Sequence, residues 1–217
     1  MKCRLLTWEE IHSLAYGLAK KISDSEFRPD AVIALARGGL VPARAVSDFL
    51  GIRDLLSLKV EHWGFTAKKD AKANLRYKTP LDVEGKRVLI LDDCADTGQS
   101  LKVAREWVSG FKPEEVRTAV LHIFDTTPRK LWPDFWVEKL PWTWLIYPWN
   151  AIEDGINLIL EVLKERKRIE LPRLEQYLLE SYGFVFPEHL LDRVLERGSS
   201  LGKFRIDGDF IKNAGPA

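Results

Sequence analysis

Two adjacent carboxylates, Asp92 and Asp93, follow the apolar run Val88–Leu91 and precede a turn of small, acidic and hydroxyl-bearing residues that begins at Ala95. Acids at the end of a strand can accept hydrogen bonds from sugar hydroxyls or hold a hydrated cation. Backbone N–H groups and hydroxyls at the start of a helix are suited to binding phosphate. The segment therefore predicts a site for a sugar and a phosphate, although an acidic strand end with Thr97 as a helix N-cap would explain the same residues without a ligand.

A glycine turn, Arg37-Gly38-Gly39, forms a second candidate site. It follows the apolar run Ala31–Ala36 and precedes a helical pattern from Val41 to Leu50, so the segment reads as strand, turn and helix. Such a turn could offer backbone N–H groups and the fixed positive charge of Arg37 to an anion. By itself, a Gly-Gly turn between a strand and a helix requires no ligand.

The elements that must position these turns alternate between strands and helices. Apolar strand patterns cover residues 31–36, 87–91 and 116–123, and helical patterns cover 7–23, 41–50 and 99–109. This alternation predicts an α/β fold with a mostly parallel sheet flanked by helices, which binds ligands at the carboxyl ends of its strands. Residues 132–149 hold five of the eight tryptophans and are expected to form irregular aromatic structure that caps the sheet.

The string from Val88 to Leu101 resembles the phosphoribosyl-diphosphate signature of type I phosphoribosyltransferases, in which an apolar strand is followed by two acids and a Thr-Gly turn. The segment 36–43 is similar to the diphosphate-binding turn of the 6-oxopurine branch, where a strained peptide presents N–H groups to the diphosphate. The resemblance covers residues 31–150. It implies purine salvage, in which a purine base and phosphoribosyl diphosphate give a nucleoside 5'-monophosphate and diphosphate with Mg²⁺.

The resemblance also implies roles for individual residues. Asp96 would act as the base that deprotonates the purine, and Arg37 would neutralise the departing diphosphate. Asp92 and Asp93 would grip the ribose hydroxyls, directly or through Mg²⁺. The full set expected to bind phosphoribosyl diphosphate is Arg37, Gly38, Gly39, Lys59, Asp92, Asp93, Ala95, Asp96, Thr97, Gly98, Gln99 and Ser100.

A basic segment between the glycine turn and the paired acids lies where the family has its flexible catalytic loop. We expect residues 60–80 to form a mobile lid over the bound substrate, because the segment is long and lacks clean periodicity. Which of its basic residues contacts the diphosphate stays open; the candidates are Lys68, Lys69, Lys72 and Arg76.

The expected base-binding residues are Thr127 and the segment Trp144-Leu145-Ile146, which is similar to the hood motif of purine enzymes, where the first Trp stacks on the base. Thr127 stands where 6-oxopurine enzymes have a lysine that donates to the 6-oxo group. The missing lysine favours adenine, and a branch of archaeal adenine phosphoribosyltransferases has a similar helical C-terminal extension. A hypoxanthine or guanine enzyme, with Lys130 as the donor, is the alternative.

We expect residues 1–154 to form the catalytic core, with the hood at about 124–150, and residues 155–217 to form a helical extension. The part after residue 150 carries ten basic and twelve acidic residues, a balance that argues against nucleic acid. A regulator that senses phosphoribosyl diphosphate without catalysis is the alternative from another class. The sequence shows no apolar run of roughly 18 residues, which predicts a cytoplasmic protein without membrane contact, and we expect a homodimer.

Overall fold

The computed structural model describes residues 1–62, 73–76 and 80–214, which fall into two compact units. One unit is Glu9–Trp142, and the other combines Met1–Trp8 with Thr143–Ala217. The division comes before the expected boundary at residue 154. The physical reason is that strand β8 (Trp144–Ile146) pairs with the N-terminal strand β1 (Cys3–Leu5) and not with the large sheet.

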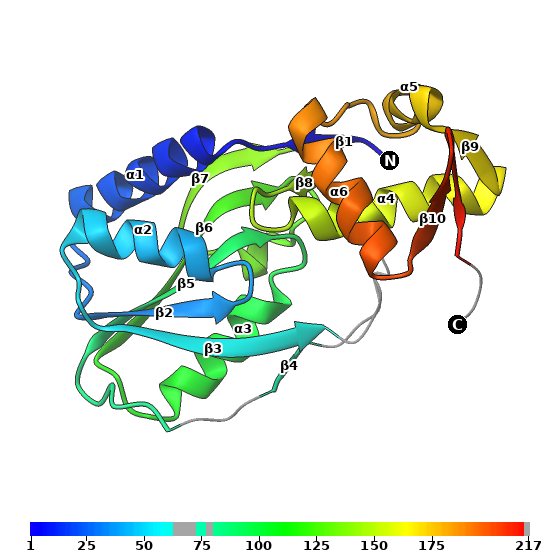
Figure 1. Ribbon diagram of the computed structural model, residues 1–217. Helices are drawn as coiled ribbons and strands as arrows, with labels where there is room; N and C mark the ends of the chain where they lie inside the picture. The colour runs from blue at the N-terminus through cyan, green and yellow to red at the C-terminus, as the bar shows by residue number, and fades with distance from the viewer. Residues whose placement is uncertain (63–72, 77–79, 215–217) are drawn as a thin grey trace. The chain divides into compact units, whose positions relative to one another are not determined.

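A six-stranded sheet forms the centre of the unit Glu9–Trp142 (Figure 1). The strand order is β4-β3-β2-β5-β6-β7, and every neighbouring pair is parallel except β3 with β4. The predicted α/β fold with a mostly parallel sheet is therefore confirmed. The bounds are β2 (Ala31–Ala36), β3 (Leu55–His62), β4 (Ala73–Leu75), β5 (Arg87–Ala95), β6 (Glu115–Phe124) and β7 (Phe135–Leu140).

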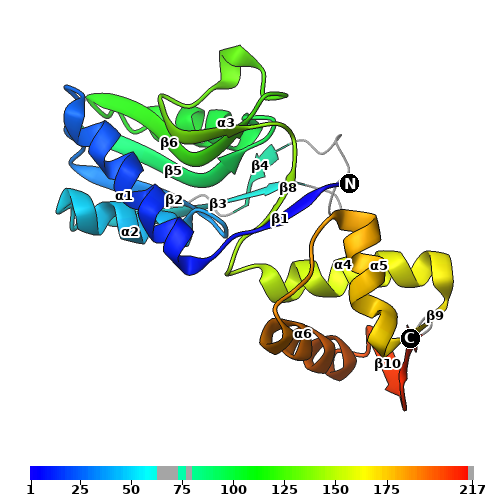
Figure 2. The same ribbon diagram turned by 90° about the horizontal axis from the view of Figure 1, so that it is seen from above.

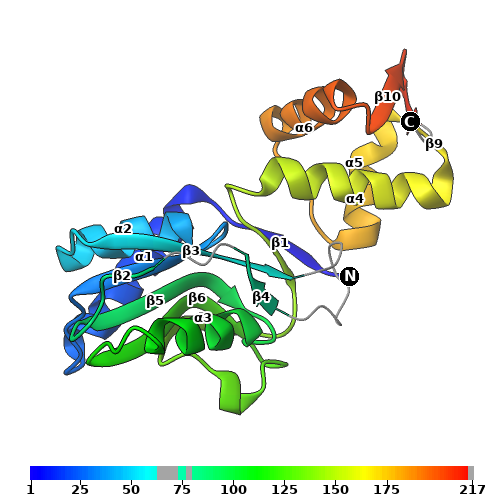
Figure 3. The ribbon, with the colours of Figure 1, turned by 90° about the horizontal axis from the view of Figure 1, so that it is seen from below.

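Helices cover both faces of this sheet. Helices α1 (Trp8–Asp24) and α2 (Leu40–Leu50) lie on one face, and α3 (Gln99–Ser109) lies on the other (Figure 3). Residues of α3 pack into one hydrophobic cluster with buried residues of β2, β5 and β6. The apolar spacing of α1 predicted that one face of this helix is buried, and the buried face holds Ile11, Leu14, Leu18 and Ile22.

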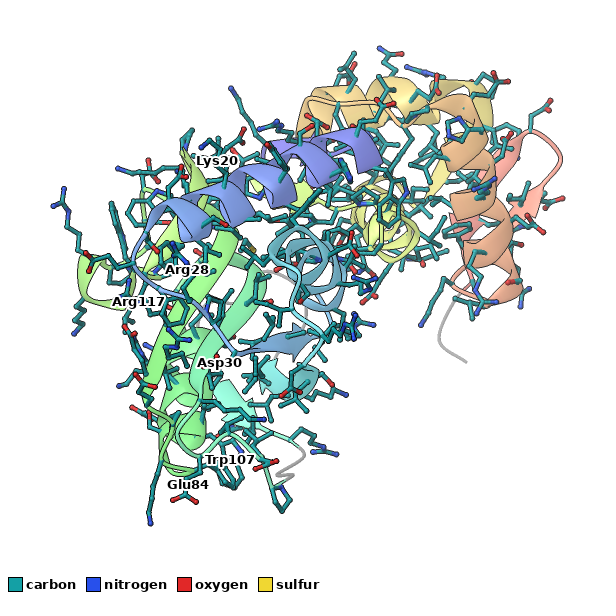
Figure 4. The ribbon with its side chains drawn as sticks, turned by 90° about the vertical axis from the view of Figure 1, so that its left-hand side faces the viewer. Lys20, Arg28, Asp30, Glu84, Trp107 and Arg117 are labelled. Atoms are coloured by element: carbon teal, nitrogen blue, oxygen red, sulfur yellow. The ribbon has the colours of Figure 1, made fainter. Side chains whose placement is uncertain are left out.

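Ion pairs and a cation–π contact hold the amino ends of the strands. Arg87 at the start of β5 pairs with Asp30, which precedes β2, at 3.1 Å. The Arg117 guanidinium lies 4.9 Å from the centre of the Phe27 ring; Asp30 and Arg117 are labelled in Figure 4. This edge is thus bound by contacts within the protein, and the two candidate turns lie at the opposite, carboxyl edge.

In its described part, the second unit is built from helices and two small sheets (Figure 2). Helices were expected after residue 154, but the sheet formed by β9, β10 and β11 was not expected from the sequence. The elements after β8 are α4 (Ala151–Arg166), β9 (Arg168–Glu170), α5 (Leu171–Tyr182), α6 (Glu188–Ser200), β10 (Phe204–Asp207) and β11 (Phe210–Asn213). Among the described residues, no helix combines the length and hydropathy that crossing a bilayer requires.

Two predictions about local structure in the larger unit were wrong. Strand β5 does not end at Leu91 but continues to Ala95, because β6 offers a parallel partner along this whole length. The tryptophan-rich segment is not irregular throughout, since it contains strand β7, which pairs with β6, and strand β8; the 3₁₀ helix η1 (Arg129–Leu131) comes directly before it.

Candidate active site

The two turns singled out from the sequence lie next to each other at the carboxyl edge of the sheet. Strands β2 and β5 are neighbours, with Ala34 opposite Leu91. The chain leaves β2 toward β3 on one side and leaves β5 toward β6 on the other, so the strand order reverses between them. In open α/β sheets, ligands bind at this reversal, in the crevice outside the carboxyl ends of the strands.

The glycine turn is pressed against strand β5. A Cβ atom on Gly38 would stand 2.1 Å from Oδ2 of Asp93, and one on Gly39 would stand 2.5 Å from the carbonyl oxygen of Leu91 and 2.9 Å from Cα of Asp92. Only glycine fits these approaches without a shift of the neighbouring atoms. The peptide bond that enters the turn, between Ala36 and Arg37, is cis.

The paired acids are held by backbone N–H groups. Asp93 N–H donates to Oδ1 of Asp92 at 3.0 Å, and Cys94 N–H donates to Oδ1 of Asp93 at 2.7 Å. Burial and the neighbouring charge of Asp93 raise the pKa of Asp92 well above its ordinary value, although the backbone N–H groups of Asp93 and Gly39 lower it in part. Holding both Asp92 and Asp93 in the ionised form is therefore unfavourable here unless a cation or hydroxyl donors compensate the charge.

The turn after the acids leads into α3 through Gly98, which has a left-handed φ of 72° and is the N-cap of the helix. Oγ1 of Thr97 accepts a long hydrogen bond from Gln99 N–H at 3.4 Å. A Cβ on Gly98 would stand 2.6 Å from the carbonyl oxygen of Leu131, so the turn packs directly on η1. Half-buried Asp96 lies within this turn, two residues before Gly98.

The acids fit an indirect magnesium site better than a complete protein-built one. In the described ranges, no cluster of three or more His, Cys, Asp or Glu side chains could hold a metal ion. Mg²⁺ typically takes one or two carboxylates and fills its remaining positions with water and substrate oxygens. Asp92 and Asp93 provide such a pair.

The predicted basic residues are placed only in part. Arg37 is exposed in the glycine turn, and Lys59 on β3 lies opposite Ala36, beside that turn. Arg76 follows β4, and its backbone N–H donates to the carbonyl oxygen of Lys59 at 2.8 Å. The other three predicted loop residues, Lys68, Lys69 and Lys72, lie outside the described residues, as does most of the expected lid.

Thr127 is buried and bridges two segments of the site. Its hydroxyl donates to the carbonyl oxygen of Ala95 at 2.7 Å and accepts from Phe124 N–H at 3.2 Å. Its own carbonyl oxygen accepts from Nε1 of Trp132 at 2.9 Å. The hydroxyl therefore fastens the turn after β6 to the end of β5, and contact of Thr127 with a base stays a prediction.

The expected hood residues lie in the other unit. Trp144 is half-buried, whereas Leu145 and Ile146 are buried, and Ile146 belongs to the hydrophobic core of that unit. The Trp144 N–H donates to the carbonyl oxygen of Lys2, and the Ile146 carbonyl oxygen accepts from Leu6 N–H, both at 3.0 Å. The N-terminal segment thus fixes this strand, and its role in base binding stays a prediction.

Sequence reasoning missed the contribution of η1 and its neighbours. Leu131 packs on Gly98, and Trp132 is hydrogen-bonded to Thr127, so both support the acidic turn. Arg129 and Lys139 each place their charged group 5.4 Å from the centre of the Trp132 ring. In the sequence, Pro128 and the residues up to Trp132 indicate only a turn. The contacts around Trp132 also depend on β7, which has no clear strand pattern in the sequence.

Comparison with known proteins agrees with this geometry. The phosphoribosyl transferase domain model matches residues 4–144. The crystal structure of a purine phosphoribosyltransferase from Pyrococcus horikoshii is 32% identical and aligns over 69% of this chain and 94% of that chain, with a TM-score of 0.59. A xanthine-guanine phosphoribosyltransferase of Idiomarina loihiensis is 29% identical over 67% of this chain and 85% of its own length. Xanthine phosphoribosyltransferase 1 of Saccharomyces cerevisiae is 28% identical over 67% of this chain and 88% of its own length. Because the family model covers well over half of the residues and coincides with the unit that carries both turns, the chain belongs to the phosphoribosyltransferase domain family.

Proposed function

We propose that this protein transfers the phosphoribosyl group of phosphoribosyl diphosphate to a 6-oxopurine, and so makes a nucleoside 5'-monophosphate and diphosphate. The observation that carries the proposal is the contact of Gly38 with Asp93, which joins the diphosphate turn to the ribose-binding acids. The names of the relatives support a purine as the acceptor.

Each part of the site has a task in this reaction. Asp92 and Asp93 hold the ribose hydroxyls, and the first turn of α3 with the Thr97 hydroxyl holds the 5'-phosphate. Arg37 and the N–H groups of the glycine turn stabilise the negative charge of the departing diphosphate. Bound Mg²⁺, held through Asp92, Asp93 and substrate oxygens, would supply further charge neutralisation.

Asp96 acts as the general base in the proposed reaction. Displacement at the anomeric carbon passes through an oxocarbenium-like state, so the purine nitrogen must lose its proton as it attacks. A carboxylate placed in the turn between β5 and α3 can accept this proton. The carboxylate is half-buried, which limits its solvation without removing it from the reach of a substrate.

The choice of base follows the relatives and corrects the emphasis on adenine. The relative from Idiomarina loihiensis is named for xanthine and guanine, and the one from Saccharomyces cerevisiae is named for xanthine. Both names favour the 6-oxopurine alternative. The Thr127 hydroxyl gives no reason to prefer a 6-amino group, because it already makes two hydrogen bonds within the protein. Lys130 is exposed on η1, three residues further on, and is our candidate donor to the 6-oxo group.

A diphosphate-release assay with separate bases tests the proposal. We expect turnover with xanthine, guanine or hypoxanthine and little with adenine. Lys130→Gln should raise KM for the preferred 6-oxopurine by roughly 10- to 150-fold, the value of one hydrogen bond from a charged donor. Lys20→Gln, which removes an exposed lysine on α1, is the matched control. Preference for adenine would overturn the 6-oxopurine assignment, and tight binding of phosphoribosyl diphosphate without turnover of any base would favour the non-catalytic regulator.

A further inference from the structure

The second unit has a connectivity that its sequence pattern did not reveal. After α4, the short strand β9 leads into α5 and α6, and the hairpin β10–β11 then returns to β9, giving the sheet order β10-β11-β9. Helices α5 and α6 are joined by the short segment 183–187, which begins at Gly183 with a left-handed φ of 78°. Two helices joined by a glycine-containing turn form a helix–turn–helix, and here a β-hairpin follows, as in winged forms of that motif (Figure 2).

Close packing fixes the inward face of α6, the second helix of this motif. A Cβ on Gly155 of α4 would stand 2.7 Å from a methyl group of Val194, and one on Gly198 would stand 2.1 Å from the Phe204 ring of β10. Val194, Gly198 and Phe204 are buried. The helix is thus held against α4 on one part of its surface and against the hairpin on another, and its remaining surface is exposed.

The exposed surface of α6 carries charges in two stripes. His189, Arg193 and Arg197 are exposed and recur every four residues, so they lie along one side of the helix. Glu188, Asp192 and Glu196 form an adjacent acidic stripe by the same spacing. The two charge types therefore run side by side along the helix, each in a stripe of its own.

The small sheet carries a row of three basic residues. Arg205 lies opposite Lys212, and Lys212 lies opposite Arg168, so the three occupy one row across β10, β11 and β9. The Arg168 guanidinium lies 3.5 Å from the centre of the Phe210 ring, and Nζ of Lys212 pairs with Asp207 at 2.7 Å. Arg168 and Arg205 are exposed, and the ring beneath Arg168 limits the positions that its guanidinium can take.

The net charge of this unit hides a segregation of charge. Residues 164–173 contain five basic and two acidic side chains, and residues 203–213 contain three basic and two acidic ones. Residues 174–202 contain five acidic and two basic side chains. The expectation against nucleic acid used the sum over the whole extension, whereas binding depends on where the charges lie.

We propose that this C-terminal unit binds double-stranded DNA, with the basic stripe of α6 and the basic row of the sheet contacting its phosphates. The observations favour B-form DNA because its major groove admits a helix, whereas the major groove of double-stranded RNA is too narrow for side chains to read. The proposal does not rest on the reaction proposed above, since every residue in it belongs to the unit that holds the hairpin.

Fluorescence anisotropy of the full chain with a labelled duplex of mixed sequence, about 30 base pairs or three helical turns long, tests this proposal. We expect binding that weakens with salt. Removing two phosphate contacts should reduce the slope of log affinity against log salt by about two. The paired variants are Arg193→Gln with Arg197→Gln on the helix and Arg168→Gln with Arg205→Gln on the sheet; the matched control is Lys20→Gln with Lys102→Gln, which removes two exposed lysines elsewhere.

Opposite changes sharpen the test. Neutralising the acidic stripe of α6 should strengthen DNA binding, because it removes repulsion from the phosphates. The basic-row and basic-stripe variants should leave phosphoribosyl transfer unchanged, and Arg→Lys variants at the same positions should retain binding if loss of charge is the cause. The proposal is overturned if the duplex does not bind at low salt, if the lysine control loses as much affinity, or if single strands or anionic vesicles bind equally well.

Discussion

Gly38 approaches Asp93 so closely that a Cβ atom on the glycine would lie 2.1 Å from a carboxylate oxygen of the acid. This contact joins the ends of two neighbouring strands, β2 and β5, at the reversal of strand order. A diphosphate held by the glycine turn and a ribose held by the acids would therefore share one surface. The position of each turn constrains the other.

Alanine at the two glycines should have different consequences. The atoms crowded by Gly38→Ala belong to the carboxylate of Asp93, which can rotate away, so we expect weaker binding of phosphoribosyl diphosphate with the fold retained. Gly39→Ala crowds the backbone of Leu35, Leu91 and Asp92, which cannot rotate away, and should lower the midpoint of thermal unfolding as well. Calorimetric titration and thermal unfolding measure the two effects; equal unfolding midpoints would contradict this distinction.

Substitution of the paired acids should chiefly affect substrate binding. Asp92→Asn and Asp93→Asn each remove a carboxylate that accepts ribose hydroxyls or supports Mg²⁺, so the Kd for phosphoribosyl diphosphate should rise at least tenfold, about 1.4 kcal/mol. Asp125→Asn, an exposed acid after β6, is the control. If both variants titrate the substrate as the parent does, the acids do not hold the ribose.

Asp92→Asn should also alter the dependence of stability on pH. Burial and Asp93 raise the pKa of Asp92 in the folded protein, so between the unfolded pKa of about 4 and this raised value the folded state binds more protons than the unfolded state. The free energy of unfolding contributed by this group therefore falls as pH rises. Without substrate, the variant should gain stability over the parent as pH increases above about 4. A constant difference across denaturant titrations at several pH values would argue against the raised pKa.

Asp96→Asn should lower turnover without loss of substrate binding. A positioned general base contributes roughly 10²- to 10⁴-fold to the rate, and the amide cannot accept the proton from the purine. We expect kcat to fall by that order while the Kd for phosphoribosyl diphosphate stays near that of the parent. Single-turnover kinetics separate the two quantities, and full activity of the variant would eliminate this role.

Thr127→Val should uncouple the turn after β6 from the acidic turn. Valine keeps the shape but leaves the Ala95 carbonyl oxygen and the Phe124 N–H without their partner, which costs roughly 1 to 3 kcal/mol per buried group. Thr127→Ser keeps the hydroxyl and should restore the parent's stability and kcat/KM. If the serine variant is as impaired as the valine variant, the methyl packing of Thr127 matters and its hydrogen bonds do not.

The sequence predicted the central strands and both turns because their signals are local. The apolar run before Arg37 and the one before Asp92 are strands buried on both faces, and each ends at a glycine-containing turn that begins a helix. The helix α3 begins and ends where its pattern predicted. Such elements depend on neighbouring residues in the chain, so one sequence suffices to find them.

The elements that were missed depend on partners far away in the chain. Strand β7 has partly buried residues at every position except the exposed Lys139 and is an edge strand, so no alternation or apolar run marks it. The end of β5 and the hydrogen bonds of Thr127 are likewise defined by contacts with β6 and with the turn after it. Strand β9 is only three residues long and strands β10 and β11 are four each, which is too short for a periodic signal.

The pairing of β1 with β8 has a consequence for protein synthesis. Cys3 lies opposite Trp144, so β1 is synthesised before nearly the whole larger unit and its partner strand only after it. At about 5 to 20 residues per second, the intervening chain takes roughly 7 to 28 s to appear. Strand β1 must therefore wait for its partner while the six-stranded sheet is being synthesised, and a fusion before β1 that delays its docking would leave β8 without the one strand that pairs with it in their two-stranded sheet.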